Sequence, residues 1–253
     1  MKRDAESLRV VIVDDEAPAR ALLREYCGAH DDVEIVGECE NGFEAARTIT
    51  EKAPDLVLLD VQMPKLDGFE VLELLDRPPI VVFVTAYDEF ALRAFEVHAV
   101  DYVLKPVGRE RLDTALERAR VRRRAMTPPP SLRPAALAAA ARPPGEHLAR
   151  VIVKDGPSVH VIPVARIDWI EAQDDYAAIH AEGRTHLKSQ TLQELAEGLE
   201  PARFVRIHRS YLLNVDRLAR LEREAKDSHV AILKDGKVLP VSRAGYARLK
   251  ELM

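Results

Sequence analysis

The fold of this chain is decided by LVLLDVQMP, residues 56–64. Its first four residues are apolar, which is typical of a strand buried on both faces of a sheet, and they run directly into a carboxylate at Asp60. An unpaired charge at the end of a core strand costs free energy. Asp60 therefore needs a compensating charge nearby, a chemical role, or both.

Short apolar runs alternate with amphipathic segments up to residue 124. The predicted strands are residues 8–14, 33–39, 55–60, 80–86 and 101–105, and the predicted helices are residues 17–29, 42–52, 68–75, 89–97 and 108–124. Strand and helix that alternate five times predict a doubly wound α/β domain, in which helices cover both faces of a five-stranded parallel sheet.

The character of the chain changes twice after this domain. Residues 125–147 contain six prolines, which prevent a continuous helix, and we interpret them as a semi-rigid linker with an alanine-rich middle. The remaining residues are predicted to form a clear helix at 192–199, a last helix from Arg243 and short strands separated by turns. The predicted strands are residues 150–155, 158–164, 167–173, 176–181, 185–189, 211–215, 229–235 and 237–242. We therefore predict domains at residues 1–124 and 148–253, the second mostly antiparallel β.

Composition narrows the class of protein. Apolar residues make up 47% and charged residues 31% of the chain, which is typical of a folded globular protein. No apolar run reaches the roughly 18 residues that cross a bilayer, and the start MKRDAE does not resemble a signal peptide. The spacing of Cys27 and Cys39 is not that of metal ligands, so we expect two reduced thiols and a cytoplasmic protein.

Charge is distributed unevenly along the chain. Through residue 124 there are 18 Lys and Arg against 26 Asp and Glu, a net charge of −8, whereas the rest of the chain carries +3. An acidic first half suits cation binding, and a mildly basic second half is compatible with a polyanionic partner. A charge of +3 is too small to demonstrate nucleic-acid binding by itself.

Chemically active side chains stand at the ends of four predicted strands. Asp14 and Asp15 follow the first, Asp60 the third, Thr85 ends the fourth and Lys105 ends the fifth. Because ligands of open parallel sheets bind at the carboxyl ends of the strands, these groups are expected to meet at one edge. Taken separately, the two adjacent acids could simply cap the following helix, and the threonine and lysine could be ordinary surface or strand residues.

Adjacent carboxylates repel each other, and a hard divalent cation removes this difficulty. Mg²⁺ prefers carboxylate and water oxygens, so we predict a magnesium site with Asp15 and Asp60 as direct ligands. Asp14 would act through water, and the main-chain carbonyl of Gln62 could complete the ligands from the protein. Lys105 would supply a fixed positive charge opposite.

Four motifs of the first half resemble the receiver domain of two-component response regulators. They are VIVDDE, LLDVQMPKLDG, VTAYDEFALRAF and DYVLKPV, in the usual order and spacing. The resemblance implies a flavodoxin-like sheet and phosphorylation of Asp60 by a sensor histidine kinase. It further implies that Thr85 follows the phosphoryl group, that Tyr102 turns inward with it, and that the bond between Lys105 and Pro106 is cis. A static core position is the alternative for the tyrosine.

The second half resembles the LytTR DNA-binding domain. The segments IDWIEAQDDYAAIHA, THLKSQTLQEL, FVRIHRSYLLNV and LPVSRAGYARLKEL carry this resemblance, the third most specifically. Carried over by position, the candidates for base contacts are Asp175, Tyr176, Ala177, Arg209 and Arg243, and those for phosphate contacts are Lys188, His208 and Ser210. Asp174 and Asp175 fit poorly beside phosphate, and we interpret them as a turn that faces away from DNA. The alternative for any single arginine is a surface ion pair.

The two resemblances together predict a cytoplasmic transcriptional regulator that is not an enzyme. Phosphorylation would pair two chains through the fourth helix, fifth strand and fifth helix, and the homodimer would bind double-stranded promoter DNA. A magnesium-dependent phosphohydrolase is a weaker alternative, because such enzymes usually carry a second acid where this chain has Gln62. A protein- or RNA-binding output module is another, and the salt dependence of DNA binding distinguishes it.

Overall fold

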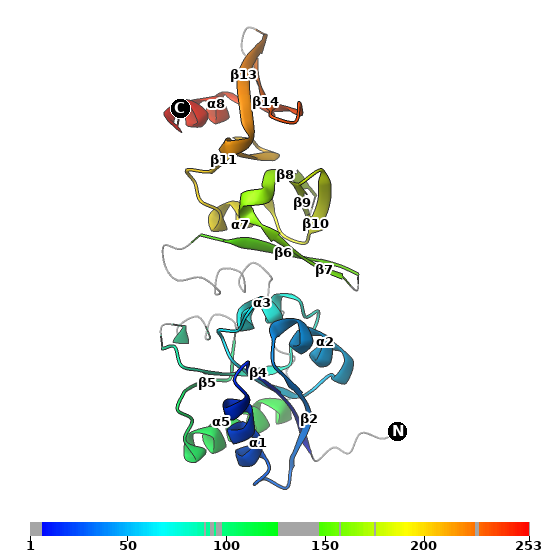
Figure 1. Cartoon of the computed structure of the whole chain (residues 1–253), viewed down its shortest axis with the longest axis vertical. Helices are drawn as coiled ribbons and strands as arrows, with labels where there is room; N and C mark the ends of the chain where they lie inside the picture. The colour runs from blue at the N-terminus through cyan, green and yellow to red at the C-terminus, as the bar shows by residue number, and fades with distance from the viewer. Residues whose placement is uncertain are drawn as a thin grey trace. The chain divides into compact units, whose positions relative to one another are not determined.

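The computed structural model describes residues 7–88, 90, 91, 94, 98–125, 147–156, 158–174, 176–225 and 228–252. The chain divides into two compact units, Met1–Pro143 and Pro144–Met253 (Figure 1). Of the predicted linker, only the first and last residues, Ala125 and His147, are among the described residues. Most of the predicted helix at 89–97 also lies outside them.

The N-terminal unit is built on one parallel sheet. Its strands are β1 Leu8–Val13, β2 Val33–Cys39, β3 Leu56–Leu59, β4 Ile80–Thr85 and β5 Asp101–Leu104, in the spatial order β2-β1-β3-β4-β5. The described helices are α1 Ala17–Cys27, α2 Gly42–Lys52, α3 Gly68–Glu73 and α5 Arg109–Arg124. This topology confirms the predicted doubly wound α/β fold. The order reverses direction beside β1 and β3, which is where such sheets bind their ligands.

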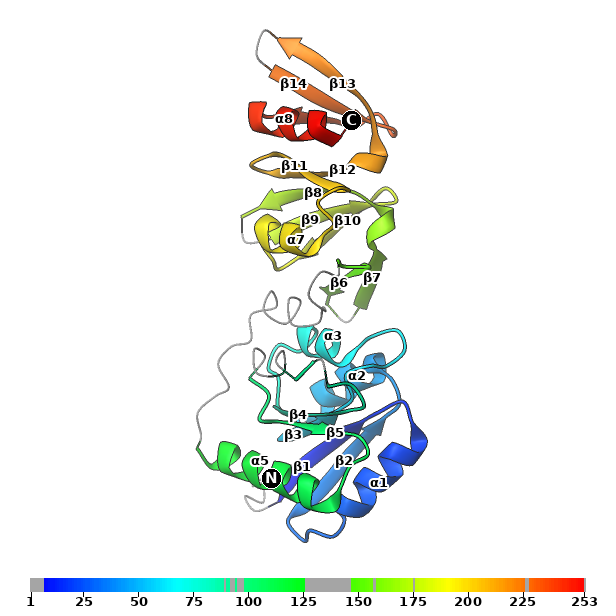
Figure 2. The ribbon, with the colours of Figure 1, turned by 90° about the vertical axis from the view of Figure 1, so that its left-hand side faces the viewer.

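Alternation of side chains along the strands divides the core between two faces. Val82 and Val84 of β4 belong to a buried cluster with residues of α1 and α5. Phe83 points to the other face, where its ring centroid lies 4.7 Å from that of Phe69 on α3. Figure 2 shows α2 and α3 on the side of the sheet away from α5. Both faces are covered, so the central strand β3 is wholly apolar and buried, whereas the edge strand β2 carries Glu34 and Glu38.

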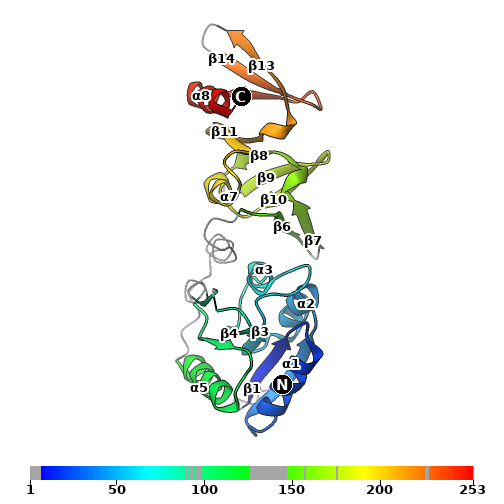
Figure 3. The same cartoon turned by 60° about the vertical axis from the view of Figure 1, so that its left-hand side comes forward.

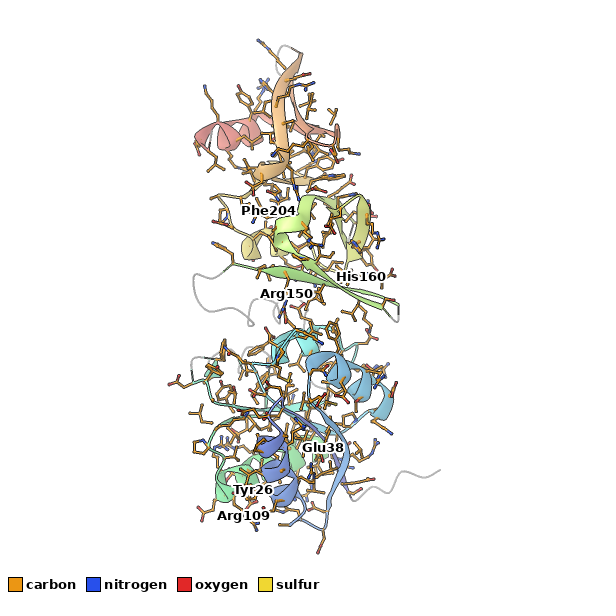
Figure 4. The ribbon with its side chains drawn as sticks, viewed as in Figure 1. Tyr26, Glu38, Arg109, Arg150, His160 and Phe204 are labelled. Carbon is orange, nitrogen blue, oxygen red and sulfur yellow. The ribbon has the colours of Figure 1, made fainter. Side chains whose placement is uncertain are left out.

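The first and last helices of this unit lie next to each other. The guanidinium carbon of Arg109, on α5, lies 5.2 Å from the ring centroid of Tyr26, on α1 (Figure 4). Cys27, also on α1, is a buried free thiol, and burial raises its pKa to about 11. Cys39 at the end of β2 is likewise free and buried. A buried thiol of raised pKa carries little thiolate and is unreactive at neutral pH.

The C-terminal unit is dominated by antiparallel strands (Figure 3). A five-stranded sheet has the order β10-β9-β8-β12-β11, a three-stranded sheet the order β13-β14-β15, and β6 and β7 form a hairpin. The bounds are β6 Arg150–Asp155, β7 Ser158–Pro163, β8 Ile167–Gln173, β9 Tyr176–Ala181, β10 Arg184–Lys188, β11 Phe204–His208, β12 Tyr211–Asn214, β13 Leu218–Ala225, β14 Ser228–Leu233 and β15 Val238–Val241. The prediction of a mostly antiparallel β domain is confirmed.

Two helices complete this unit, α7 Leu192–Gly198 and α8 Arg243–Leu252. Thr191 and Glu194 form a capping box at the start of α7, which stabilises the first turn of the predicted helix. Two strands were not predicted, β11 and β13. The second is an edge strand rich in Arg and Glu, so it lacks the apolar run by which strands are recognised in sequence.

Within the described residues, no helix is long and apolar enough to cross a membrane.

Candidate functional site

The register of the parallel sheet brings the acidic residues to one edge. Asp60 follows β3, and its main-chain NH donates to the carbonyl of Val13, the last residue of β1. The NH of Asp14 donates in turn to the carbonyl of Cys39 at the end of β2. Both carboxylates are buried, with residue exposures of 0% for Asp14 and 5% for Asp60. The charge at the end of the core strand is therefore shielded from bulk water and requires compensation within the protein.

Lys105 supplies that compensation. Its ammonium lies 2.8 Å from Asp14 Oδ2, 2.8 Å from Asp60 Oδ2 and 3.1 Å from Glu16 Oε2. Burial alone would lower the pKa of Lys105, but its hydrogen bonds with Asp14 and Asp60 raise it above the usual value. Burial raises the pKa of Asp14, and the hydrogen bond from Lys105 offsets part of that increase. The lysine therefore stays charged and forms ion pairs with three acids at once.

The main chain around this lysine is held by the neighbouring strand. The NH of Lys105 donates to the carbonyl of Thr85 at 2.8 Å, which continues the β4–β5 pairing beyond the end of β5. The peptide bond between Lys105 and Pro106 is cis, which confirms the expectation drawn from the resemblance. The contact between Lys105 and Glu16 was not predicted.

The carboxylates suit a hard divalent cation. One oxygen each of Asp14, Asp15 and Asp60 lies within 4.8 Å of the others, and Asp15 is exposed to solvent. Asp15, Asp60 and Gln62 line an open cleft of about 540 Å³ at this edge of the sheet. Three carboxylates against one ammonium leave a net negative site, and oxygen ligands at this spacing are what Mg²⁺ prefers. The residues present thus fit the predicted cofactor.

The alternative that Asp14 and Asp15 merely cap α1 does not describe this structure. Glu16 occupies the N-cap position of α1, and no side chain caps that helix end by a hydrogen bond. Asp14 Oδ1 instead accepts from the main-chain NH of Glu16 at 3.0 Å, which orients the buried carboxylate. Its second oxygen is left to face Lys105.

Gly68 allows the loop after Asp60 to close tightly. A Cβ at this position would overlap the carbonyl oxygen of Asp60, so any side chain would displace the main chain at the acid. The NH of Gly68 donates to the carbonyl of Val61 at 2.8 Å. Asp67 caps α3 in a capping box with Glu70, which fixes the far end of the same loop.

Thr85 and Tyr102 flank this edge in different ways. The hydroxyl of Thr85 is fully buried, and no group in the described residues forms a hydrogen bond with it. Such an unsatisfied buried hydroxyl is uncommon and suggests a partner that binds later. Tyr102 is half-buried, and its hydroxyl donates to the main-chain carbonyl of Tyr87, a residue that lines the cleft. The centroid of the Tyr102 ring lies 6.2 Å from that of the buried Phe83, so the ring packs beside the core and its hydroxyl contacts a residue of the cleft.

The C-terminal unit gathers several predicted contact residues at one end of its large sheet. Arg209 and Ser210 form the turn between β11 and β12, directly after His208. The carbonyl of Ser210 accepts from the NH of Ala172 near the end of β8, at 2.9 Å. Tyr176 follows the turn after β8 and is 49% exposed. These turns lie at neighbouring strand ends, as a composite surface requires.

Arg243 reaches the same region through its neighbour in the chain. Both the NH and the hydroxyl of Ser242 donate to the carbonyl of Ile207 on β11, at 2.8 and 3.0 Å. The exposed Arg243, which begins α8, is thereby held beside the strand that leads into the Arg209 turn. Residues more than thirty positions apart in sequence are brought together.

The other predicted contacts are placed less favourably. Ala177 is fully buried in the core of the unit, so its side chain is not accessible to a base. The ammonium of Lys188 donates to the carbonyl of Ile152 at 2.7 Å and is engaged inside the unit. His208 Nδ1 accepts from the NH of Ser210 at 3.2 Å. Asp175 lies outside the described residues, and Asp174 adopts a left-handed conformation with φ of 50°, as a turn residue can.

Comparisons with known proteins cover both units. The family model of the response regulator receiver domain matches residues 10–117, and that of the LytTr DNA-binding domain matches residues 158–253. An uncharacterized response regulatory protein of Shewanella oneidensis is 38% identical over 247 residues, which is 96% of this chain and 97% of that protein. The transcriptional regulatory protein BtsR of Escherichia coli is 36% identical over 249 residues, with 96% and 98% covered. The sensory transduction protein LytT of Bacillus anthracis is 31% identical, with 97% and 99% covered.

Proposed function

Because this chain belongs to the response regulators in which a receiver domain precedes a LytTR DNA-binding domain, we propose that phosphorylation of Asp60 controls its binding to promoter DNA. Its domains and relatives are those of a two-component transcriptional regulator. The observation that supports the finer proposal most strongly is the buried Asp60 carboxylate, 2.8 Å from the ammonium of Lys105 and beside two further acids.

The chemistry follows from these positions. An oxygen of Asp60 attacks the phosphorus of a phosphohistidine on a sensor histidine kinase, forming a P–O bond as the P–N bond breaks and the histidine regains a proton. Lys105 then pairs with an oxygen of the transferred group instead of the free carboxylate. The hydroxyl of Thr85 gains a phosphoryl oxygen as its partner, and Tyr102 moves with the loop that carries Tyr87.

Magnesium would be held by Asp15, Asp60 and the carbonyl of Gln62, with Asp14 acting through water. When bound, the ion supplies positive charge to the oxygens of the transferring phosphoryl group. Aspartyl phosphohydrolases share this logic, but here the exposed Gln62 stands where their second acid would be, so we propose a regulator rather than an enzyme.

Substituting Lys105→Met tests the electrostatics of this site. The change keeps the volume but leaves the buried Asp14 and Asp60 carboxylates without a counter-charge, so we expect a loss of about 3 kcal/mol in unfolding free energy without Mg²⁺. Added Mg²⁺ should restore part of it and stabilise the variant more than the wild type. Urea unfolding followed by the helical circular dichroism signal, in EDTA and in Mg²⁺, measures both effects.

Lys52→Met is the matched control, because Lys52 is exposed at the end of α2, away from the acidic edge. This control should leave stability and its Mg²⁺ dependence nearly unchanged. Equal stabilisation of wild type and Lys105→Met by Mg²⁺ would show that the lysine and the cation do not share the same carboxylates.

The C-terminal unit would read DNA through the turns at one end of its sheet. We propose that Arg209 and Arg243 contact base edges, since a guanidinium can hold guanine O6 and N7 with two hydrogen bonds. His208, Ser210 and Tyr176 lie at the same end and would contact the backbone or flanking bases. Contacts by Lys188 and Asp175 stay predictions, and the ammonium of Lys188 would have to leave the carbonyl of Ile152 to reach a phosphate.

Replacing Arg209 or Arg243 with Ala should separate base reading from general attraction. We expect about tenfold weaker binding to a duplex selected by the wild type from a random pool, and a smaller loss on a scrambled duplex. Fluorescence anisotropy at several salt concentrations measures both. Arg166→Ala is the control, because it removes an exposed guanidinium at the opposite end of the same sheet.

Two outcomes of this experiment would revise the proposal. Equal losses on both duplexes would make the substituted arginine a phosphate contact. If the wild type binds no duplex with a steep salt dependence, the output is a protein- or RNA-binding module instead.

The remaining proposals concern the binding partners of the protein and its localisation in the cell. We propose a sensor histidine kinase as phosphoryl donor, double-stranded promoter DNA as target and pairing of two chains after phosphorylation. The face of β5 and α5 offers the exposed Leu104 and Val121 for such pairing. A protein that meets both a kinase and promoter DNA would work in the cytoplasm. The boundaries 1–124, 125–147 and 148–253 stay predictions.

A further inference from the structure

Two arginines of the C-terminal unit donate to main-chain carbonyls of the segment that carries Arg209. Arg206 Nη2 donates to the carbonyl of Arg209 at 2.8 Å, and Arg248 Nη1 donates to the carbonyl of Arg206 at 2.6 Å. Some other arginines of this unit pair with carboxylates, such as Arg203 with Asp216, and Arg217 donates to the carbonyl of Ala165 as well as facing Asp168. Guanidinium groups therefore hold the main chain of this segment at two carbonyls, those of Arg206 and Arg209.

The segment needs such support because its strand pairing is irregular. The register of β11 and β12 shifts between Arg206 and His208, so that the ladder does not continue evenly into the turn. An irregularity of this kind leaves main-chain groups without ladder partners. In the turn between β11 and β12, the Arg206 guanidinium donates to the carbonyl of Arg209. The NH of Ser210 donates to His208 Nδ1 in the same turn.

Helix α8 is held against the same strand by contacts that allow little sliding. Ser242 donates twice to the carbonyl of Ile207, and its hydroxyl accepts from the NH of Gly245 at 3.1 Å. Gly245 lies so close that a Cβ there would overlap the Ile207 carbonyl. Arg248 then adds its bond to Arg206 one turn further along α8. A continuous path of contacts thus runs from α8 to the Arg209 turn.

We propose that Arg206 and Arg248 are positioning residues, which set the spacing between Arg209 on the turn and Arg243 at the start of α8. The inference rests on the proposed DNA-binding function. It adds which residues hold Arg209 and Arg243 at the distance that base contacts require. Two readers on separate elements discriminate between sequences only if their separation matches that of the bases. The alternative is that both guanidiniums contact phosphates directly, which would weaken binding to every duplex alike.

The test uses the full chain, incubated with Mg²⁺ and acetyl phosphate, and two duplexes: one enriched by the wild type from a random pool and a scrambled one of the same composition. Arg206→Met and Arg248→Met each remove a guanidinium but keep an unbranched stem. We expect about tenfold weaker binding to the enriched duplex and less than about twofold change on the scrambled one. Lys250→Met is the control, because it removes a charge from an exposed position on α8. It should change binding to neither duplex.

A double substitution separates positioning from direct contact. If Arg206 acts through Arg209, adding Arg206→Met to Arg209→Ala should cause no further loss of discrimination. Arg206→Lys, which keeps a charged donor, should restore part of it. Unfolding midpoints followed by the single tryptophan, Trp169, check that each variant is folded.

Three results would overturn the inference. These arginines would be phosphate contacts if both duplexes lose affinity equally and if the slope of log affinity against log salt concentration becomes shallower by about one unit. Additive losses in the double variant would make Arg206 an independent reader. Full discrimination in the single variants would remove any role, whereas a wild type that fails to discriminate would overturn the DNA-binding proposal itself.

Discussion

Asp60→Asn is expected to reduce stable uptake of a phosphoryl group, from acetyl phosphate or a kinase, by about a hundredfold or more. Asparagine has nearly the same shape as aspartate, but its amide is a poor nucleophile and cannot form an acyl phosphate. Intact-protein mass spectrometry measures the uptake, and release by hydroxylamine identifies the acyl phosphate. The same samples in light scattering show whether phosphorylation pairs two chains, which the variant should fail to do.

The control for this experiment is Asp31→Asn. Asp31 is an exposed residue in the loop before β2, at the end of the sheet opposite Asp60, so its loss should leave uptake unchanged. Phosphate uptake that persists in Asp60→Asn would refute the assignment of the phosphorylated residue. Uptake by the wild type without any change in association would leave the chemistry intact and contradict the pairing proposal alone.

Of the substitutions considered in the C-terminal unit, Gly245→Ala should destabilise it most, and it should also disturb DNA reading, because α8 begins with Arg243. Alanine is favoured over glycine within a helix by up to about 1 kcal/mol. That gain is outweighed here, since the added Cβ would overlap the main chain of Ile207, and no side-chain rotation can relieve the overlap. Overpacking of this kind costs about 1–3 kcal/mol, or roughly 5–20 °C in the unfolding midpoint of a unit this size.

Trp169 makes the effect measurable in the C-terminal unit alone. It is the only tryptophan of the chain, and it is buried in the core cluster that also contains Ile207 and Leu249 of α8. Ala244→Ser is the matched control, because it also adds one heavy atom to the same turn of helix but at an exposed position. An unchanged midpoint in Gly245→Ala would mean that α8 can move away from β11 at little cost.

Local pattern was sufficient for the fold and for the edge where the site lies. Apolar runs of strand length alternating with amphipathic segments can bury their surface only as a parallel sheet between helices, and parallel strands bring their carboxyl ends to one edge. Asp14, Asp15, Asp60 and Lys105 therefore had to meet. The capping boxes before α3 and α7 are likewise local, since both partners lie within four residues.

Sequence patterns failed where a residue's role depends on partners distant in the chain. The edge strand β13 lacks an apolar run, and β11, which begins at the buried Phe204 labelled in Figure 4, has only two adjacent apolar residues before Arg206. Ala177 was predicted to approach DNA, but it is buried in the core of the C-terminal unit.

The sequence by itself determined which groups stand at the strand ends, because spacing along a strand sets the face and the edge that each residue reaches. Only the tertiary structure decided what each charge is paired with. Lys105 serves Glu16 in addition to the two buried acids, and Arg206 and Arg248 donate to carbonyls rather than to carboxylates. The physical reason is that long flexible cations take whichever acceptor the packing of distant segments brings within about 3 Å, and no local pattern encodes that distance.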